Sequence, residues 1–105
     1  MHTNQKFRLS FISNQWGVCS RDGSPRIPVD TAIVDVTYQS PNHIEGYIVA
    51  VHGLDQEVAK YLDSQTLRDL GVGAQVRRAP RLKTRRAQLN ADGSVEWTFP
   101  PKGGK

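Results

Sequence analysis

Two runs of β-branched and aromatic residues, joined by a turn-forming segment, constrain the fold of this chain more than any other feature. The runs cover residues 32–38 and 47–51, and the sequence SPNH lies between them at residues 40–43. Such a cluster between two apolar runs is typical of a turn that joins strands. Both alternating faces of the second run are apolar, which is typical of a strand covered on both sides. We therefore expect this pair near the centre of a sheet, with Asp35 on an exposed face.

Further strand patterns occur on both sides of this pair. Residues 6–13 alternate between apolar and polar side chains, as in a strand that is half-buried. An Asn/Asp/Gly cluster at residues 90–94 separates two alternating segments, and this predicts a β-hairpin between residues 87–89 and 95–99. A short strand is also expected at residues 74–77. The chain is therefore rich in β-structure.

One segment, residues 55–70, has the period of a helix. Asp55 is suited to the N-cap, and Gly71 is suited to the position that follows the last turn. The helix should lay one stripe of mostly apolar residues on the sheet. That stripe consists of Val58, Ala59, Leu62, Thr66 and Leu70. An alternative is two short helices that separate at Asp63 and Ser64.

The order of these elements predicts a single α+β, β-rich domain that covers residues 1–105. Two architectures agree with it, namely a small antiparallel sheet with the helix packed on one face or an OB-like barrel. Either would have about five to six strands, with the helix between the third and fourth main strands. A chain of 105 residues is long enough to bury its own core. Residues 1–5 and 100–105 are expected to be flexible termini.

Cysteine content and motif searches argue against several classes of protein. The single Cys19 cannot form an internal disulfide, and no apolar run has the length of a signal peptide or a membrane span. We therefore expect a cytoplasmic protein without a membrane partner. Cys19, His43 and His52 lie in no activating motif, and the sequence has no P-loop, Rossmann glycine pattern or zinc-ligand spacing. We therefore predict no catalytic residue, metal or cofactor.

Positive charge is concentrated in one segment near the C-terminus. Up to Val76 the chain has six Lys/Arg and eight Asp/Glu, whereas from Arg77 onward it has eight Lys/Arg and two Asp/Glu. Six of the ten residues at 77–86 are positively charged and none is negative. Arginine, which dominates this segment, can hold phosphates bidentately and stack on bases. Pro80 argues against a basic amphipathic helix of the membrane-binding kind. The alternative is a solvated loop that pairs with the acidic body of the protein.

These observations favour a small non-enzymatic domain that binds single-stranded DNA or RNA. The expected backbone contacts are Arg77, Arg78, Arg81, Lys83, Arg85 and Arg86. Tyr38 and Trp16 lie near the ends of predicted strands and could add base stacking. Trp97 is expected in the core, because Val95 and Phe99 share its face.

A second hypothesis is a protein-interaction module, either an adaptor or an inhibitor. Such a module would dock its basic loop or a sheet edge onto an acidic partner surface. A homodimer formed through a sheet edge is compatible with both hypotheses.

Overall fold

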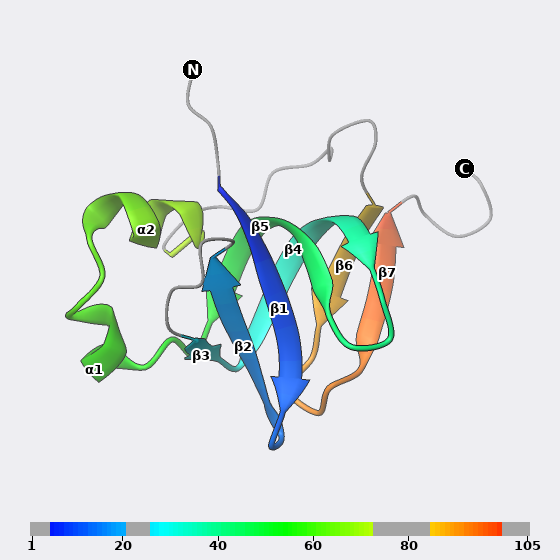
Figure 1. Ribbon diagram of the computed structural model, residues 1–105, viewed down its shortest axis with the longest axis horizontal. Helices are drawn as coiled ribbons and strands as arrows, with labels where there is room; N and C mark the ends of the chain where they lie inside the picture. Colours follow the sequence, from blue (N-terminus) through cyan, green and yellow to red (C-terminus); the bar gives the residue numbers. More distant parts are fainter. Residues whose placement is uncertain (1–4, 21–25, 73–84, 100–105) are drawn as a thin grey trace.

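The computed structural model of the protein describes residues 5–20, 26–72 and 85–99, and these residues form one antiparallel sheet with two short helices (Figure 1). The strands are β1 (Lys6–Ile12), β2 (Gln15–Ser20), β3 (Ile27–Val29), β4 (Thr31–Gln39), β5 (Ile44–His52), β6 (Arg85–Leu89) and β7 (Val95–Phe99). Their order across the sheet is β3-β2-β1-β5-β4-β6-β7, so the described part of the sheet is open, with β3 and β7 at its edges. The β-rich α+β class is confirmed, but the strands number seven rather than five to six.

The predicted central pair is confirmed as β4 and β5, which run antiparallel along almost their whole length. Two irregularities interrupt their register, one after Ile33 and one after Val36. Irregularities of this kind bend a strand and increase its twist. Between them, Gly46 allows the two backbones to approach closely, because a Cβ built at this position would lie 2.2 Å from the carbonyl oxygen of Asp35.

Two other hairpins flank the central pair. The β1–β2 hairpin turns at Ser13 and Asn14, whose φ angles of 56° and 63° are those of a tight turn that follows the twist of the strands. The β6–β7 hairpin turns within the predicted cluster at residues 90–94 and is confirmed. The predicted strand at residues 74–77 lies outside the described residues, as do residues 1–4 and 100–105 of the expected flexible termini.

The sheet is so strongly bent that the tips of the two flanking hairpins meet. The indole Nε1 of Trp16 donates a hydrogen bond of 2.7 Å to the carbonyl oxygen of Asn90. Gly93 packs closely against the ring of Phe11, and a Cβ at Gly93 would lie 2.7 Å from that ring. The bent sheet therefore wraps around one apolar core. The largest fully buried side chains of that core are Phe7, Leu9, Leu70, Leu89, Val18, Val29 and Val34.

The predicted helix at residues 55–70 is two helices, α1 (Gln56–Ala59) and α2 (Ser64–Asp69), between β5 and β6. The expectation of one helix was wrong, because Asp63 accepts a hydrogen bond from the backbone of Thr66 and caps the second helix. Figure 1 shows both helices at one end of the molecule, beside β3. Leu70 is fully buried, whereas Val58 and Leu62 are only half-buried. In the described part of the chain, neither helix is long and apolar enough to cross a membrane.

Candidate nucleic-acid interface

Eight residues were predicted to contact nucleic acid, and the structure describes four of them. Arg77, Arg78, Arg81 and Lys83 lie outside the described residues. Tyr38, Trp16, Arg85 and Arg86 are described, and they lie in four different environments.

Arg86 faces a buried carboxylate. It is 9% exposed, and it lies directly opposite Asp35 in the pairing of β6 with β4. Its Nε and Nη2 donate to the two carboxylate oxygens of Asp35 at 2.8 and 3.3 Å. This bidentate geometry is the strong form of an ion pair. Arg86 is thus held by the protein's own carboxylate, and the expectation of an exposed Asp35 was wrong, since this residue is buried.

Trp16 is an internal residue that holds two hairpins together. Its side chain is 4% exposed. The ring packs against Phe11 with centroids 5.2 Å apart, and its N–H donates to Asn90 as described above. Both contacts are those of a buried amphipathic aromatic residue. The ring of Trp16 is therefore enclosed and does not offer a face on which a base can stack.

Arg85, the neighbour of Arg86, is exposed and lies over an aromatic ring. Successive side chains of a strand point to opposite faces of the sheet, so Arg85 and Arg86 at the start of β6 lie on opposite faces. The guanidinium carbon of Arg85 lies 4.1 Å from the centroid of the Trp97 ring, which is a cation–π contact. Trp97 packs against the core as predicted, but it is half-buried rather than fully buried.

Tyr38 lies near the end of β4 and has an exposed ring, with 54% of the residue accessible. Its ring is 5.7 Å from that of His43. A shallow hollow of about 160 Å³ connects Tyr38 with the arginine–tryptophan pair. We call this region the β4-end surface, and its lining residues are Val36, Thr37, Tyr38, Gln39, Arg85 and Trp97.

Two cationic side chains, Arg8 and Lys6, lie on the sheet face next to the β4-end surface. In the strand register Arg8, Glu45 and Tyr38 form one row across β1, β5 and β4, and residues opposite each other share a face. Lys6 lies in the next row, with its Nζ 5.8 Å from the centroid of the Tyr47 ring. Sequence reasoning missed Lys6 and Arg8, although the polar half of the alternating segment at residues 6–13 could have indicated them.

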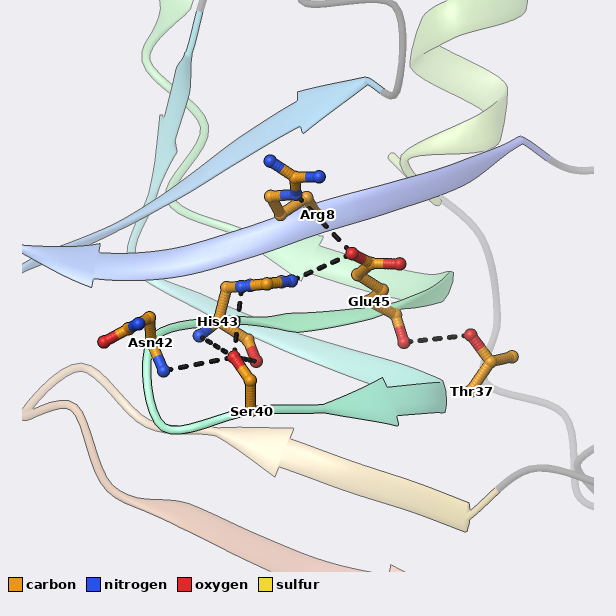
Figure 2. A network of polar contacts seen from close by, with 6 residues as sticks. All are labelled: Arg8, Thr37, Ser40, Asn42, His43 and Glu45. Carbon is orange, nitrogen blue, oxygen red and sulfur yellow. Dashed lines mark hydrogen bonds and ion pairs between the residues drawn. The ribbon is translucent and has the colours of Figure 1, made fainter.

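Figure 2 shows how a polar network holds the turn between β4 and β5. His43 Nε2 lies 2.8 Å from Glu45 Oε2, and the Nε of Arg8 lies 3.6 Å from the same oxygen. Ser40 Oγ lies 3.1 Å from His43 Nδ1, so a serine, a histidine and a carboxylate are linked in one chain. The same three kinds of group form the catalytic triad of serine hydrolases, in which the serine hydroxyl gives its proton to the histidine and attacks the substrate.

The hydroxyl of Ser40 is engaged by the turn itself. Its oxygen accepts hydrogen bonds from the backbone N–H groups of Asn42, at 3.2 Å, and His43, at 3.1 Å. The backbone N–H of Ser40 also donates to the carbonyl oxygen of His43 at 2.9 Å. Serine side chains commonly close turns in this way. We therefore assign the network to the shape of the turn, where it also holds His43 beside Tyr38.

The described residues contain no group of three or more His, Cys, Asp or Glu side chains that could hold a metal ion. Cys19 is a free, partly exposed thiol in β2. The β4-end surface itself presents the exposed ring of Tyr38 and the guanidinium of Arg85 over Trp97. No protein-family model, no curated protein and no solved structure matches this chain.

Proposed function

We propose that the protein binds single-stranded DNA or RNA at the β4-end surface. The observation that supports this most directly is the exposed guanidinium of Arg85 over the ring of Trp97, across one hollow from the exposed Tyr38. Proteins that bind single strands without strong sequence preference combine aromatic stacking platforms with a basic track for the backbone. Both kinds of group are present here.

The charge distribution supports a polyanionic ligand. Arg85 belongs to the basic segment at residues 77–86, in which six of the ten residues are positively charged and none is negative. Lys6 adds positive charge on the adjacent sheet face, whereas the charge of Arg8 is paired with Glu45. Each phosphate contact with a single strand adds about −0.7 to the slope of log affinity against log salt concentration. Because Arg86 is committed to Asp35, five contacts from the segment would give a slope of about −3.5.

A single strand is favoured over a duplex because the hollow offers ring faces rather than a groove-reading element. The bases of a duplex are stacked on each other, whereas unpaired bases can turn toward aromatic and guanidinium planes. The second architecture considered from the sequence, an OB-like barrel, stays a prediction. The proposal depends on exposed residues around the end of β4 and does not require the barrel to close.

Fluorescence anisotropy with labelled oligo(dT) and oligo(U) tests the proposal, at salt concentrations from about 50 to 200 mM. We expect the affinity of both oligomers to fall steeply with salt. Tyr38→Ala should weaken binding about 5- to 150-fold, since one stacked base is worth about 1–3 kcal/mol. Arg85→Ala should weaken binding and make the salt slope shallower by about 0.7.

Tyr61→Ala and Lys60→Ala are matched controls, because they remove an exposed aromatic ring and an exposed cation from the helical end of the molecule. These variants should bind as the wild type does. Equal losses in the control variants would refute the assignment to the β4-end surface. Labelled poly-glutamate that binds as tightly as the oligonucleotides would instead support a docking surface for an acidic protein.

A further inference from the structure

A cavity of about 590 Å³ lies between the two helices and the strands at the opposite end of the molecule. Phe7 of β1 and Ile27 of β3 form one side of the cavity. Val58 and Leu62, from the apolar stripe predicted for the helical segment, form the other side. The stripe thus faces a space instead of packing fully on the sheet, which explains why these two side chains are only half-buried.

Two charged residues line this cavity, and each directs its charged group to a partner elsewhere. The Nη2 of Arg26 donates to the carbonyl oxygens of Gln15, at 2.8 Å, and Ser10, at 3.3 Å. The carboxylate of Glu57 is exposed and lies 3.4 Å from the Nζ of Lys60. The groups left to face the interior are apolar side chains and Gln5, because the hydroxyl of Thr66 bonds to Asp63 and Ser20 has a partner of its own.

The size and lining of the cavity are those of a small-molecule site. Ligand pockets commonly have volumes of about 300–1,000 Å³ and combine a mostly apolar lining with a few polar groups. Tyr61 lines the cavity and is 85% exposed, so an aromatic ring stands at its opening with a face free of the core. A stable protein partner needs a broad surface of roughly 800 Å² on each side, whereas this space is concave and bounded by elements of one domain.

We propose that this cavity binds a small, neutral, mainly apolar molecule with an aromatic or branched aliphatic body. Apolar contact with Val58, Leu62 and Tyr61, over a floor formed by the buried Phe7 and Ile27, would supply affinity, and Gln5 would orient one oxygen or nitrogen atom. A ligand that carries a full charge is disfavoured, because the charged groups at the rim already have partners and a charge is costly to bury unpaired. The site lies at the other end of the sheet from the β4-end surface and does not depend on nucleic-acid binding.

Chemical-shift mapping by two-dimensional NMR tests this proposal, with 2-naphthol as the neutral probe and 2-naphthoate as its charged counterpart. We expect 2-naphthol to shift the amides of residues around the cavity and to saturate them. Leu62→Trp fills the space from within and should weaken 2-naphthol binding by at least about tenfold. Ile12→Trp places the same ring on an exposed position at the far hairpin and should leave binding unchanged.

Tyr61→Ala provides a second test that does not depend on repacking, because the residue is almost fully exposed. It should weaken 2-naphthol binding through loss of the ring at the opening while the thermal stability of the protein stays the same. The proposal is overturned if shifts are spread evenly over the surface, or if Leu62→Trp and Ile12→Trp bind the probe equally. It is also overturned if 2-naphthoate binds more tightly than 2-naphthol.

Discussion

Replacing Asp35 with asparagine tests how much of the stability of the sheet depends on one buried ion pair. Asp35 and Arg86 face each other across β4 and β6, and their side chains are about one tenth exposed. Asparagine has nearly the same shape but carries no charge and offers one acceptor oxygen instead of two. The variant therefore leaves the guanidinium of Arg86 in place and removes the charge that neutralises it.

The expected loss follows from the position of the pair inside the protein. Removing one partner of a buried ion pair costs about 3–5 kcal/mol, because the remaining charge is left without compensation in a poorly solvated site. Since asparagine retains one acceptor, we expect a value at the lower end, about 3 kcal/mol. For a domain of this size each kcal/mol lowers the melting temperature by about 4–8 °C, so the variant should melt about 12–24 °C lower.

Urea unfolding followed by tryptophan fluorescence measures this loss, because Trp16 is buried and reports on the core. The double variant Asp35→Leu/Arg86→Met should recover most of the stability, since apolar replacements of a buried pair are often neutral or favourable. Glu96→Gln neutralises an exposed carboxylate of β7 and should change stability by less than about 0.5 kcal/mol. A loss below about 1 kcal/mol for Asp35→Asn would show that the pair is solvated, and the reasoning would then be wrong.

Three further predictions concern other contacts of the fold. Gly46→Ala should destabilise the protein by at least about 2 kcal/mol in urea unfolding, because its Cβ would meet the backbone carbonyl of Asp35 at 2.2 Å. Trp16→Phe should cost about 1–3 kcal/mol, since the carbonyl in the β6–β7 turn loses its donor. The hydroxyl and then the backbone amide of Thr66 lower the pKa of Asp63 below its ordinary value of 3.8, so Asp63 adds stability at higher pH. That stability is lost as the pH falls below 3.8 through the folded-state pKa, and urea midpoints of wild type and Asp63→Asn should converge there.

Local patterns in the sequence identified the strands and turns, because each depends on residues close together in the chain. The β-branched runs of β4 and β5 and the Asn/Asp/Gly turn of the β6–β7 hairpin were predicted in this way. The order of the strands was not, because the pairing of β1 with β5 joins residues more than 30 positions apart. The split of the helical segment was open as an alternative, and the capping bond from the backbone of Thr66 to Asp63 decides it.

The candidate site was harder to predict, because its residues meet through the sheet register. Asp35 and Arg86 are 51 positions apart, and no spacing in the sequence indicates that they face each other. An aspartate in a β-branched run suggests that it lies on an exposed face. Asp35 is buried instead, because Arg86 of another strand, β6, neutralises it. Trp97 was expected in the core because Val95 and Phe99 share its face, and it does pack against the core. Its position in β7 also brings its ring under the guanidinium of Arg85.

The start of β6 at Arg85 explains why one basic run serves both the fold and the surface. Alternation along the strand sends Arg86 to Asp35 and the adjacent Arg85 to the ring of Trp97. The pairing of β6 with β4 fixes which face Arg85 occupies, and a shift of one residue would place Arg85 opposite Asp35 in the position of Arg86. The same shift would turn the fully buried Ala87 and Leu89 out of the core and bring Gln88 into it. The ion pair thus stabilises the sheet, while the buried apolar residues of β6 exclude that shift and keep Arg85 at the hollow beside Tyr38.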